Sequence, residues 1–386
     1  MKKKQIVFSL ALMTGATLLT GCLSDNNNSE PIEITVTKGL VVVNNGSAYN
    51  GIDGSLSFVD LEKEVAQQNV YKTANGTSLG GTPNDAIVYG QKLYVVGSDE
   101  NTVFVLNPKT FKEITKISTT ALLGEAEGVN PRHMTAYGSK VYVSTYGGYV
   151  AEIDTVAFNM TRSFKVGSVP EGLTIGLVGV SSTPMLYVAN SDYGNGNGSI
   201  SSVNLETGSI TDFKHELIRN PQEILAASDV LYVLDWGYYD ENWMQKEAGV
   251  YKIEGSEVKL VIPDATGMAG VKSTIVTFNS PYGGTETTYS IYNTRYGSLS
   301  TLNLAGDTER PIFSPAAIAI DYNTGNVMIA SRPQDPDTGY PSYAMPGYVN
   351  VYTVSGSTAN YYKSFDVGVE PHKIEFSYGT QKVELQ

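Results

Sequence analysis

A short sequence unit recurs along most of this 386-residue chain, and it restricts the fold more than any other feature. Each unit opens with a proline and a run of β-branched or aromatic residues, passes through a glycine turn, and continues with two further runs of the same kind. Residues 83–106 show the unit most clearly. Further units open every 39 to 56 residues, at Pro131, Pro170, Pro221, a degenerate copy at Thr266, Pro315 and Pro371.

A unit of this length is too small to bury its own faces, so neighbouring units must stack on one another. Repeated four-stranded sheets of this size stack radially as a β-propeller, which leaves only short, protected edges. A β-sandwich would not repeat internally at this period, and a β-helix would repeat at a shorter one. The sequence therefore predicts an all-β fold, a seven-bladed β-propeller over residues 31–386. Its seven second strands are expected near Leu40, Leu93, Val141, Leu186, Leu231, Ser290 and Val327.

The two ends of the predicted propeller are expected to share one blade. Residues 39–43 look like a second strand, whereas residues 371–376 look like an opening strand. The C-terminal strand would then complete the N-terminal blade, so that both ends are held in place. Residues 31–36 could themselves form an opening strand, so eight blades are the alternative.

The first thirty residues predict a lipid-anchored protein. Lys2 to Lys4 form a positive segment, and residues 6–19 form an apolar stretch too short for a comfortable transmembrane helix. Leu19-Thr20-Gly21-Cys22 resembles the lipobox of bacterial lipoproteins, in which the signal peptide, here residues 1–21, is removed and the cysteine is lipidated. Residues 22–30 would then be the lipidated cysteine and a flexible tether. We expect an outer-membrane lipid anchor on the cell surface; an uncleaved anchor or a chance cysteine is the alternative.

The net charge argues against one class of partner. The whole chain carries −13 at pH 7, and cleavage before Cys22 would remove three lysines and no acidic residue, which gives −16. Such a charge repels phosphate backbones, so no nucleic-acid partner is predicted. Cys22 is the only cysteine, so neither a disulfide nor a thiolate metal site is predicted.

Residues 231–243 read LYVLDWGYYDENW, a strand followed by a loop that holds both tryptophans of the chain. In a propeller, the loops that join second to third strands share one edge with the starts of the innermost strands, and ligands usually bind there. Aromatic side chains offer rigid apolar area with a polar handle, which suits a bulky ligand bearing amides. The alternative is a loop that folds back onto its own blade and buries both tryptophans.

The candidate ligand-binding residues are all expected on this edge. Two of them, His133 and His372, follow the prolines that open two innermost strands, so they are expected at the mouth of the channel. The full set is Tyr49, Arg132, His133, Tyr146, Tyr193, Trp236, Tyr238, Tyr239, Trp243, Tyr296, Arg332, Tyr340 and His372. Tyr343, Arg295, Asn44, Asn190 and Asn293 are expected beside them.

Residues suited to catalysis are few. A neutral imidazole at His133 or His372 can ligate a metal or act as a general base, and the alternative is a histidine that only hydrogen-bonds within the channel. The sequence has no glycine-rich phosphate loop, no nucleophile elbow and no His-x-x-x-His pair. Asp235, Asp240 and Glu241 lack the spacing of a calcium loop. We therefore predict a protein that is not an enzyme and holds neither a metal nor a cofactor.

Tyr187 to Asn190, followed by residues 198–208, resembles the repeat of YncE-type (YVTN) seven-bladed propellers. Together with the lipobox, the tether, residues 79–85 and the acidic, tyrosine-rich repeats, the pattern is similar to the BtuG type of Bacteroides surface lipoprotein. Those proteins capture cobalamin and pass it to the TonB-dependent transporter BtuB. The resemblance implies cobalamin or a related corrinoid as ligand and a BtuB-like transporter as partner. A propeller enzyme of the lactonase or lyase type and a protein- or glycan-binding scaffold remain alternatives.

Overall fold

The computed structural model of the chain consists of two compact units. The larger unit is Thr35–Gly379, and the smaller one comprises Met1–Ile34 and Thr380–Gln386. No helix among the placed residues is long and apolar enough to cross a membrane. The predicted signal peptide, lipobox and tether lie outside the described residues, which are 32–178, 183–227, 229–281 and 286–383.

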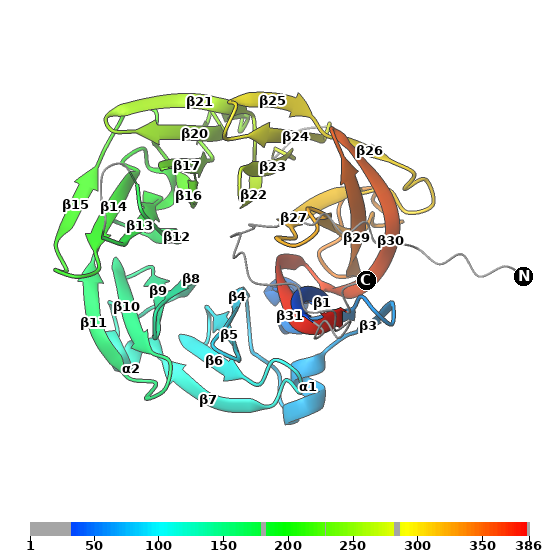
Figure 1. The fold of residues 1–386 in the computed structure, drawn as a ribbon, viewed down its shortest axis with the longest axis horizontal. Coiled ribbons are helices and arrows are strands. Elements are labelled where there is room, and N and C mark those ends of the chain that lie inside the picture. The colour runs from blue at the N-terminus through cyan, green and yellow to red at the C-terminus, as the bar shows by residue number, and fades with distance from the viewer. Residues whose placement is uncertain (1–31, 179–182, 228, 282–285, 384–386) are drawn as a thin grey trace, which may run out of the picture. The chain divides into compact units, whose positions relative to one another are not determined.

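The larger unit consists of seven small antiparallel sheets arranged in a ring, so the predicted seven-bladed β-propeller is confirmed (Figure 1). Seven strands surround the central channel as the innermost strand of each blade. They are β4 (Pro83–Tyr89), β8 (Pro131–Tyr137), β12 (Pro170–Gly176), β16 (Pro221–Ala227), β22 (Gly267–Val271), β27 (Ser314–Ile320) and β31 (Pro371–Val383).

Each innermost strand pairs with a second strand, which pairs with a third. The second strands are β5 (Lys92–Gly97), β9 (Lys140–Thr145), β13 (Met185–Asn190), β17 (Val230–Asp235), β23 (Thr274–Asn279), β28 (Val327–Arg332) and β1 (Ile32–Asn44). The third strands are β6 (Thr102–Leu106), β10 (Tyr149–Asp154), β14 (Ser199–Asn204), β20 (Gly249–Glu254), β24 (Thr288–Asn293), β29 (Pro346–Ser355) and β2 (Ser55–Asp60).

The outermost strands complete the blades. They are β7 (Glu113–Ser118), β11 (Met160–Lys165), β15 (Ile210–Phe213), β21 (Glu257–Pro263), β25 (Ser298–Thr301), β30 (Thr358–Val369) and β3 (Val65–Gln67), with β26 (Asn303–Ala305) added parallel to β30. Short helices α1 (Val70–Asn75) and α2 (Thr119–Leu123) and 3₁₀ turns η1 (Ala48–Asn50) and η2 (Asp192–Gly194) lie in connections. A small hairpin, β18 (Tyr238–Tyr239) and β19 (Gln245–Lys246), projects from one loop.

The ring closes as expected from the sequence. The C-terminal strand β31 is the innermost strand of a sheet whose other members, β1, β2 and β3, come from the start of the chain. Residues 32–36 belong to the single strand β1, so the alternative of an eighth blade opened by this segment is wrong. The N-terminal and C-terminal segments therefore depend on each other for their hydrogen bonds.

One expected strand position is wrong. Counting blades from the one that β4 opens, the fifth blade is opened by β22 and its second strand is β23. Ser290 instead lies in the third strand, β24, where it pairs with Thr277. This blade opens with Thr266-Gly267 and lacks the proline that marks the other units. Without that marker, the sequence places the blade one strand too late.

Burial explains why the second strands read as continuous apolar runs. Leu93, Tyr94, Val95 and Val96 of β5 are all buried. Leu93 and Val95 pack toward the blade that contains Val41, whereas Tyr94 and Val96 pack toward the blade of β8 and β9. A strand with a blade on each side has no polar face, because both of its faces belong to the core.

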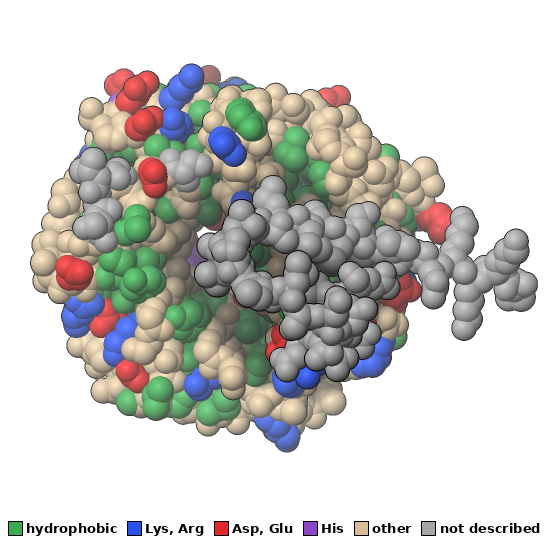
Figure 2. Space-filling view, in the orientation of Figure 1, with side chains coloured by type: hydrophobic (Ala, Val, Ile, Leu, Met, Phe, Trp, Pro, Cys, Tyr) green, Lys and Arg blue, Asp and Glu red, His purple; other side chains and the backbone are tan. Residues whose placement is uncertain are grey.

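The two edges of the ring carry different connections between strands. We call the edge with the second-to-third-strand loops and the starts of the innermost strands the upper edge, and the opposite one the lower edge. Turns on the lower edge are closed by side chains at the ends of third strands. Asn107 and Asn204, for example, each accept two backbone N–H bonds from the following turn. In Figure 2, basic and acidic side chains are dispersed around the visible part of the ring without one large basic patch.

Candidate functional site

Most of the predicted aromatic residues lie in upper-edge loops. These loops join β1 to β2, β9 to β10, β13 to β14, β17 to β20 and β28 to β29. They carry Tyr49, Tyr146, Tyr193, Trp236, Tyr238, Tyr239, Trp243, Tyr340 and Tyr343, which we call the aromatic rim. Several of these rings are mostly in solvent: the exposed fraction is 97% for Tyr49, 67% for Tyr193 and 73% for Tyr340.

Tyr296 does not belong to the rim. It lies in the turn between the third strand β24 and the outer strand β25, on the lower edge, and so does Arg295. The carboxamide of Asn293 closes the same turn by accepting the backbone N–H bonds of both residues. The expected positions of these three residues are therefore wrong, because they follow from the misplaced second strand.

The tryptophan loop projects from its blade instead of folding back onto it. Trp243 is 71% exposed and Trp236 is 37% exposed, and the indole N–H of Trp236 donates to the carbonyl of Thr266 in the next blade, at 3.0 Å. The buried Asp235 holds the base of the loop by accepting N–H bonds from Gly237 at 2.7 Å and from Arg219 at 2.9 Å. Burial raises the pKa of Asp235 to about 6, against the opposing effect of these bonds. The loop therefore presents aromatic surface on a fixed base.

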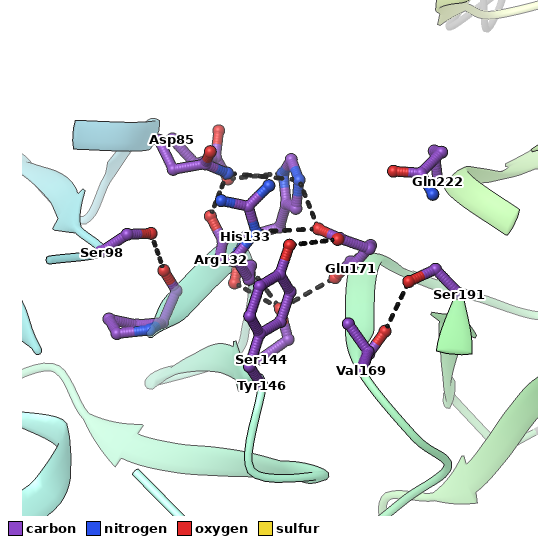
Figure 3. Close-up of polar contacts among 12 residues, drawn as sticks. Asp85, Ser98, Arg132, His133, Ser144, Tyr146, Val169, Glu171, Ser191 and Gln222 are labelled. Carbon is purple, nitrogen blue, oxygen red and sulfur yellow. Dashed lines mark hydrogen bonds and ion pairs between the residues drawn. The ribbon is translucent and has the colours of Figure 1, made fainter. Parts of the chain in front are cut away.

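A second group of residues on the upper edge is held together beside the channel by hydrogen bonds and ring contacts (Figure 3). The Tyr146 hydroxyl donates to Glu171 Oε1 at 2.7 Å, and Arg132 Nε donates to Glu171 Oε2 at 2.9 Å. The Arg132 guanidinium lies 4.8 Å from the centre of the Tyr146 ring, and the Tyr193 ring meets Tyr146 edge-on at 5.1 Å. Burial raises the pKa of the Tyr146 hydroxyl, so it remains a donor. Only Tyr193 in this group presents most of its ring to solvent.

Arg332 is also paired within the protein. Its guanidinium donates to both carboxylate oxygens of Glu370, with Nε at 2.6 Å from Oε2, and lies 5.2 Å from the centre of the Tyr343 ring. A forked pair of this kind is strong and directional. Arg332 therefore holds Glu370 and Tyr343 in place on the upper edge, and its guanidinium already donates to a carboxylate of the protein.

The asparagines expected beside the ligand are structural. Asn44 and Asn190 are buried, and their side-chain amides donate to serine hydroxyls on the neighbouring third strand of the same blade. A buried amide that bonds within its blade stabilises the sheet and contributes no donor to the upper edge. The expectation that these two residues face a ligand is wrong.

Charged residues meet at the mouth of the central channel (Figure 3). His133 Nδ1 lies 3.8 Å from Asp85 Oδ2, and His133 Nε2 lies 3.7 Å from Glu171 Oε2. Burial and the neighbouring cations Arg132 and Lys373 hold the pKa of His133 well below its usual range. The imidazole is therefore neutral near pH 7, and these separations are too long for hydrogen bonds.

His372 resembles His133 in its environment. It lines the channel, and burial lowers its pKa to about 3. Both predicted channel histidines thus lie at the mouth as neutral groups. They retain the capacity to accept or donate a single hydrogen bond, since each neutral ring has one donor and one acceptor nitrogen.

The channel contains further charged groups that sequence reasoning missed. Lys373 Nζ lies 3.1 Å from Asp85 Oδ1, and this carboxylate raises the pKa of the lysine. Glu223 and Glu375 also face the channel, and burial raises the pKa of each to about 7. Asp85, Glu223 and Lys373 each stand two residues after the proline that opens an innermost strand. That shared position is the signal that would have identified these three.

No group of three or more His, Cys, Asp or Glu side chains within the described ranges is arranged to hold a metal ion. Asp235 is committed to backbone N–H groups, as described above. Asp240 closes the turn of the tryptophan loop by accepting the N–H bonds of Asn242 and Met244, each at 2.9 Å. Two of the three carboxylates considered for calcium thus have structural partners.

Comparisons with known proteins support the scaffold. Residues 38–177 match the profile of a family described as a domain of unknown function (DUF5074), and no curated protein matches the chain. Among solved structures, Kuenenia stuttgartiensis hydrazine synthase is similar with a TM-score of 0.52 and 15% identity, over 70% of this chain and 76% of that one. The RRP9 WD40 repeats are similar with a TM-score of 0.49 and 11% identity, over 72% and 78% of the two chains. At 15% identity, the likeness to hydrazine synthase shows the fold alone and transfers no ligand or activity.

Proposed function

We propose that this protein is a non-enzymatic binding propeller whose upper edge takes a bulky, uncharged ligand with apolar edges and many amides. The observation that carries the proposal is the aromatic rim, in which exposed rings from several blades share one edge around the channel mouth. Aromatic rings bury large areas with little loss of rotamer freedom, which favours affinity for an extended, rigid ligand. We take the gathering of exposed aromatic rings on one edge as the mark of an interaction site.

The charges beside the rim favour a neutral ligand. Arg132 is paired with Glu171, Arg332 with Glu370, and Lys373 with Asp85. An anionic ligand would therefore have to compete with an internal carboxylate for each of these cations. The negative net charge of the chain adds a general repulsion. These facts argue against haem, because its propionates would meet this field.

A corrinoid such as cobalamin is the first candidate ligand. It has apolar edges and numerous amide groups, and it agrees with the resemblance to BtuG-type lipoproteins. The lipobox supports a lipid anchor at Cys22. The resemblance to BtuG-type lipoproteins implies that this anchor lies in the outer membrane at the cell surface, where a captured ligand would be delivered to a BtuB-like, TonB-dependent transporter. Paired basic groups and histidines whose lowered pKa makes them weak bases suit binding better than turnover.

Tryptophan fluorescence provides the test, because both tryptophans belong to the rim. Titration with cyanocobalamin should quench the fluorescence of the wild-type protein. Tyr193→Ala combined with Trp243→Ala should weaken binding at least tenfold, or about 1.4 kcal/mol, when measured by calorimetry. Tyr296→Ala on the lower edge is the matched control and should bind like the wild type.

Two outcomes would contradict the proposal. A wild-type protein that does not bind cyanocobalamin would remove the corrinoid as ligand. If Tyr296→Ala weakened binding as much as the rim variant, the upper edge would not be the binding surface. Hydrolysis of lactone substrates that is lost in His133→Ala would instead favour the enzyme alternative.

A further inference from the structure

The central channel contains a cavity with two unlike walls. It has a volume of about 340 Å³, near the lower end of the range of about 300–1,000 Å³ for small-molecule sites. One wall, from β4, β8, β16 and β31, holds the charged side chains and histidines of the lining together with apolar residues such as Leu225 and Phe376. We call it the charged wall; the other, from β22 and β27, is apolar. A cavity that is polar on one side and apolar on the other is suited to an amphipathic ligand.

The apolar wall consists of small and medium-sized side chains. Met268 and Ala269 of β22 and Ala317 and Ile318 of β27 line the cavity, and Phe278 of β23 lies with them. A Cβ at Gly267 would come within 2.3 Å of the Phe278 ring, so only glycine lets that ring pack against the strand here.

The charged wall has more carboxyl groups than cations. Asp85, Glu223 and Glu375 all interact electrostatically with one ammonium group, that of Lys373. The two histidines do not balance the charge, because both are neutral. When the three carboxyl groups are ionised, the wall therefore has a net negative charge.

Of the three carboxyl groups, Glu223 is the one without a hydrogen-bond donor. Asp85 accepts from the N–H of Ala86 at 2.9 Å, from the N–H of Met134 at 2.8 Å and from Lys373. Glu375 accepts from the N–H of Val88 at 2.9 Å. Within the described part of the chain, Glu223 interacts with Lys373 and Asp85 only through their charges. Its carboxyl group is thus free to bind a donor that enters the cavity.

We propose that the central channel is a second binding site, which shares Trp236 with the aromatic rim and takes a small amphipathic cation: a primary ammonium group carried on a short apolar chain. The ammonium group donates to Glu223 and supplies the missing positive charge. The apolar chain contacts Met268, Ala317 and Ile318 on the opposite wall. The inference does not depend on which ligand the rim binds.

The site should couple binding to a proton. Because burial raises the pKa of Glu223 to about 7, this group is roughly half protonated at neutral pH. A bound ammonium ion favours the carboxylate, so binding expels the remaining proton. Affinity should therefore rise about tenfold from pH 6 to pH 8, where the carboxylate fraction rises by the same factor.

The other titratable groups near Glu223 do not reverse the rise of affinity with pH. Glu171 on β12 is held by Arg132 and Tyr146, and Asp85 on β4 is held by Lys373. The remaining titratable groups of the charged wall are His133, His372 and Glu375. The histidines stay neutral from pH 6 to pH 8, and Glu375, whose pKa is also about 7, ionises in the same direction as Glu223. The channel residues of β22 and β27 do not titrate.

The test uses three probes of equal chain length: n-pentylamine, pentan-1-ol and pentanoate. Calorimetry or ligand-observed NMR on the full-length protein at pH 8 should show that the amine binds at least tenfold more tightly than the alcohol or the carboxylate. Glu223→Gln should weaken amine binding at least tenfold. Glu241→Gln, which makes the same charge change in the exposed tryptophan loop, is the control and should have no effect.

Equal binding of the amine and the alcohol would overturn the proposal, and so would a Glu223→Gln protein that is folded by circular dichroism and binds the amine normally. Cyanocobalamin titrations on the same samples keep the two sites apart. Absence of amine binding overturns the channel site alone, whereas absence of cyanocobalamin binding overturns the proposed rim function alone.

Discussion

Replacing Ile374 with alanine should reveal how much the C-terminal strand contributes to closing the ring. Ile374 lies on β31, is only 4% exposed, and packs in one cluster with Leu40 and Val42 of β1 and Phe365 of β30. Its side chain therefore joins the first and last segments of the propeller. Removing a buried isoleucine side chain costs about 2–5 kcal/mol, depending on how far the cavity collapses.

The size of the propeller determines how this loss appears in a melting curve. An unfolding entropy of about 2.1 cal/mol/K per residue, applied to the 345 residues of Thr35–Gly379, gives roughly 0.7 kcal/mol/K. A loss of about 2–5 kcal/mol then lowers the Tm by about 3–7 °C. Calorimetry or circular dichroism can measure this shift, and urea unfolding gives the free energy independently.

Two further variants make the result interpretable. Ser377→Ala changes a half-buried residue on the same strand and should stay within about 0.5 kcal/mol of the wild type. Deletion of residues 371–386 should destabilise the whole ring, because it exposes the edge of β1. If Ile374→Ala and the deletion both left the Tm unchanged, β31 would be an appendage and the account of ring closure would be refuted.

Three other predictions concern single side chains. Arg332→Lys should lower the free energy of unfolding by about 1–3 kcal/mol in urea, because lysine cannot form the forked pair with Glu370; Arg295→Lys is the exposed control, and equal effects would contradict the argument. Burial raises the folded-state pKa of Glu223 from 4.5 to about 7, so the wild type loses stability as pH rises through that interval. The free energy of unfolding of Glu223→Gln should therefore rise by up to about 3 kcal/mol relative to that of the wild type between pH 4.5 and pH 7. A difference between the two proteins that stays constant over this range would contradict the prediction. Cys22→Ser should release the protein from the membrane fraction without changing its melting curve, and a variant that remains in that fraction would argue against the lipid anchor.

The fold was predictable because proline and glycine residues mark the strand boundaries within the repeated unit. A proline at or near the start of every innermost strand except β22, with a glycine turn after several of these strands, defines most blades, and residues 371–376 have the same form as the other opening strands. The fifth blade lacks the proline, so its second strand was misplaced. Tyr296 was then assigned to the wrong edge, because the edge on which a loop lies depends on which strands it joins.

The candidate site was predictable only where exposure follows from the topology. The rim aromatics lie in loops, so their position follows once the strands are known. The carboxyl groups of the channel do not follow in the same way: Asp85 and Glu223 share a position two residues after an opening proline, but Glu375 has no such marker. They meet only when closure brings β4, β16 and β31 around one axis.

Asn44 and Asn190 illustrate a different limit of sequence reasoning. Both stand at the end of a second strand, next to the upper edge, and were expected to face a ligand. In the fold, their amides are buried and bond to serines on the adjacent third strand. Whether a polar side chain at a strand end points outward or into its own sheet depends on packing, which the order of residues does not specify.

Hydrogen–deuterium exchange of the full-length protein with and without cyanocobalamin tests the central claim most directly. The account predicts slower exchange in the upper-edge loops 191–198 and 236–247, and no change in the lower-edge turn 294–297. The lower-edge turn serves as an internal control in the same experiment. Unchanged exchange in both upper-edge loops, or protection confined to the lower-edge turn, would contradict the claim that the aromatic rim is the binding surface.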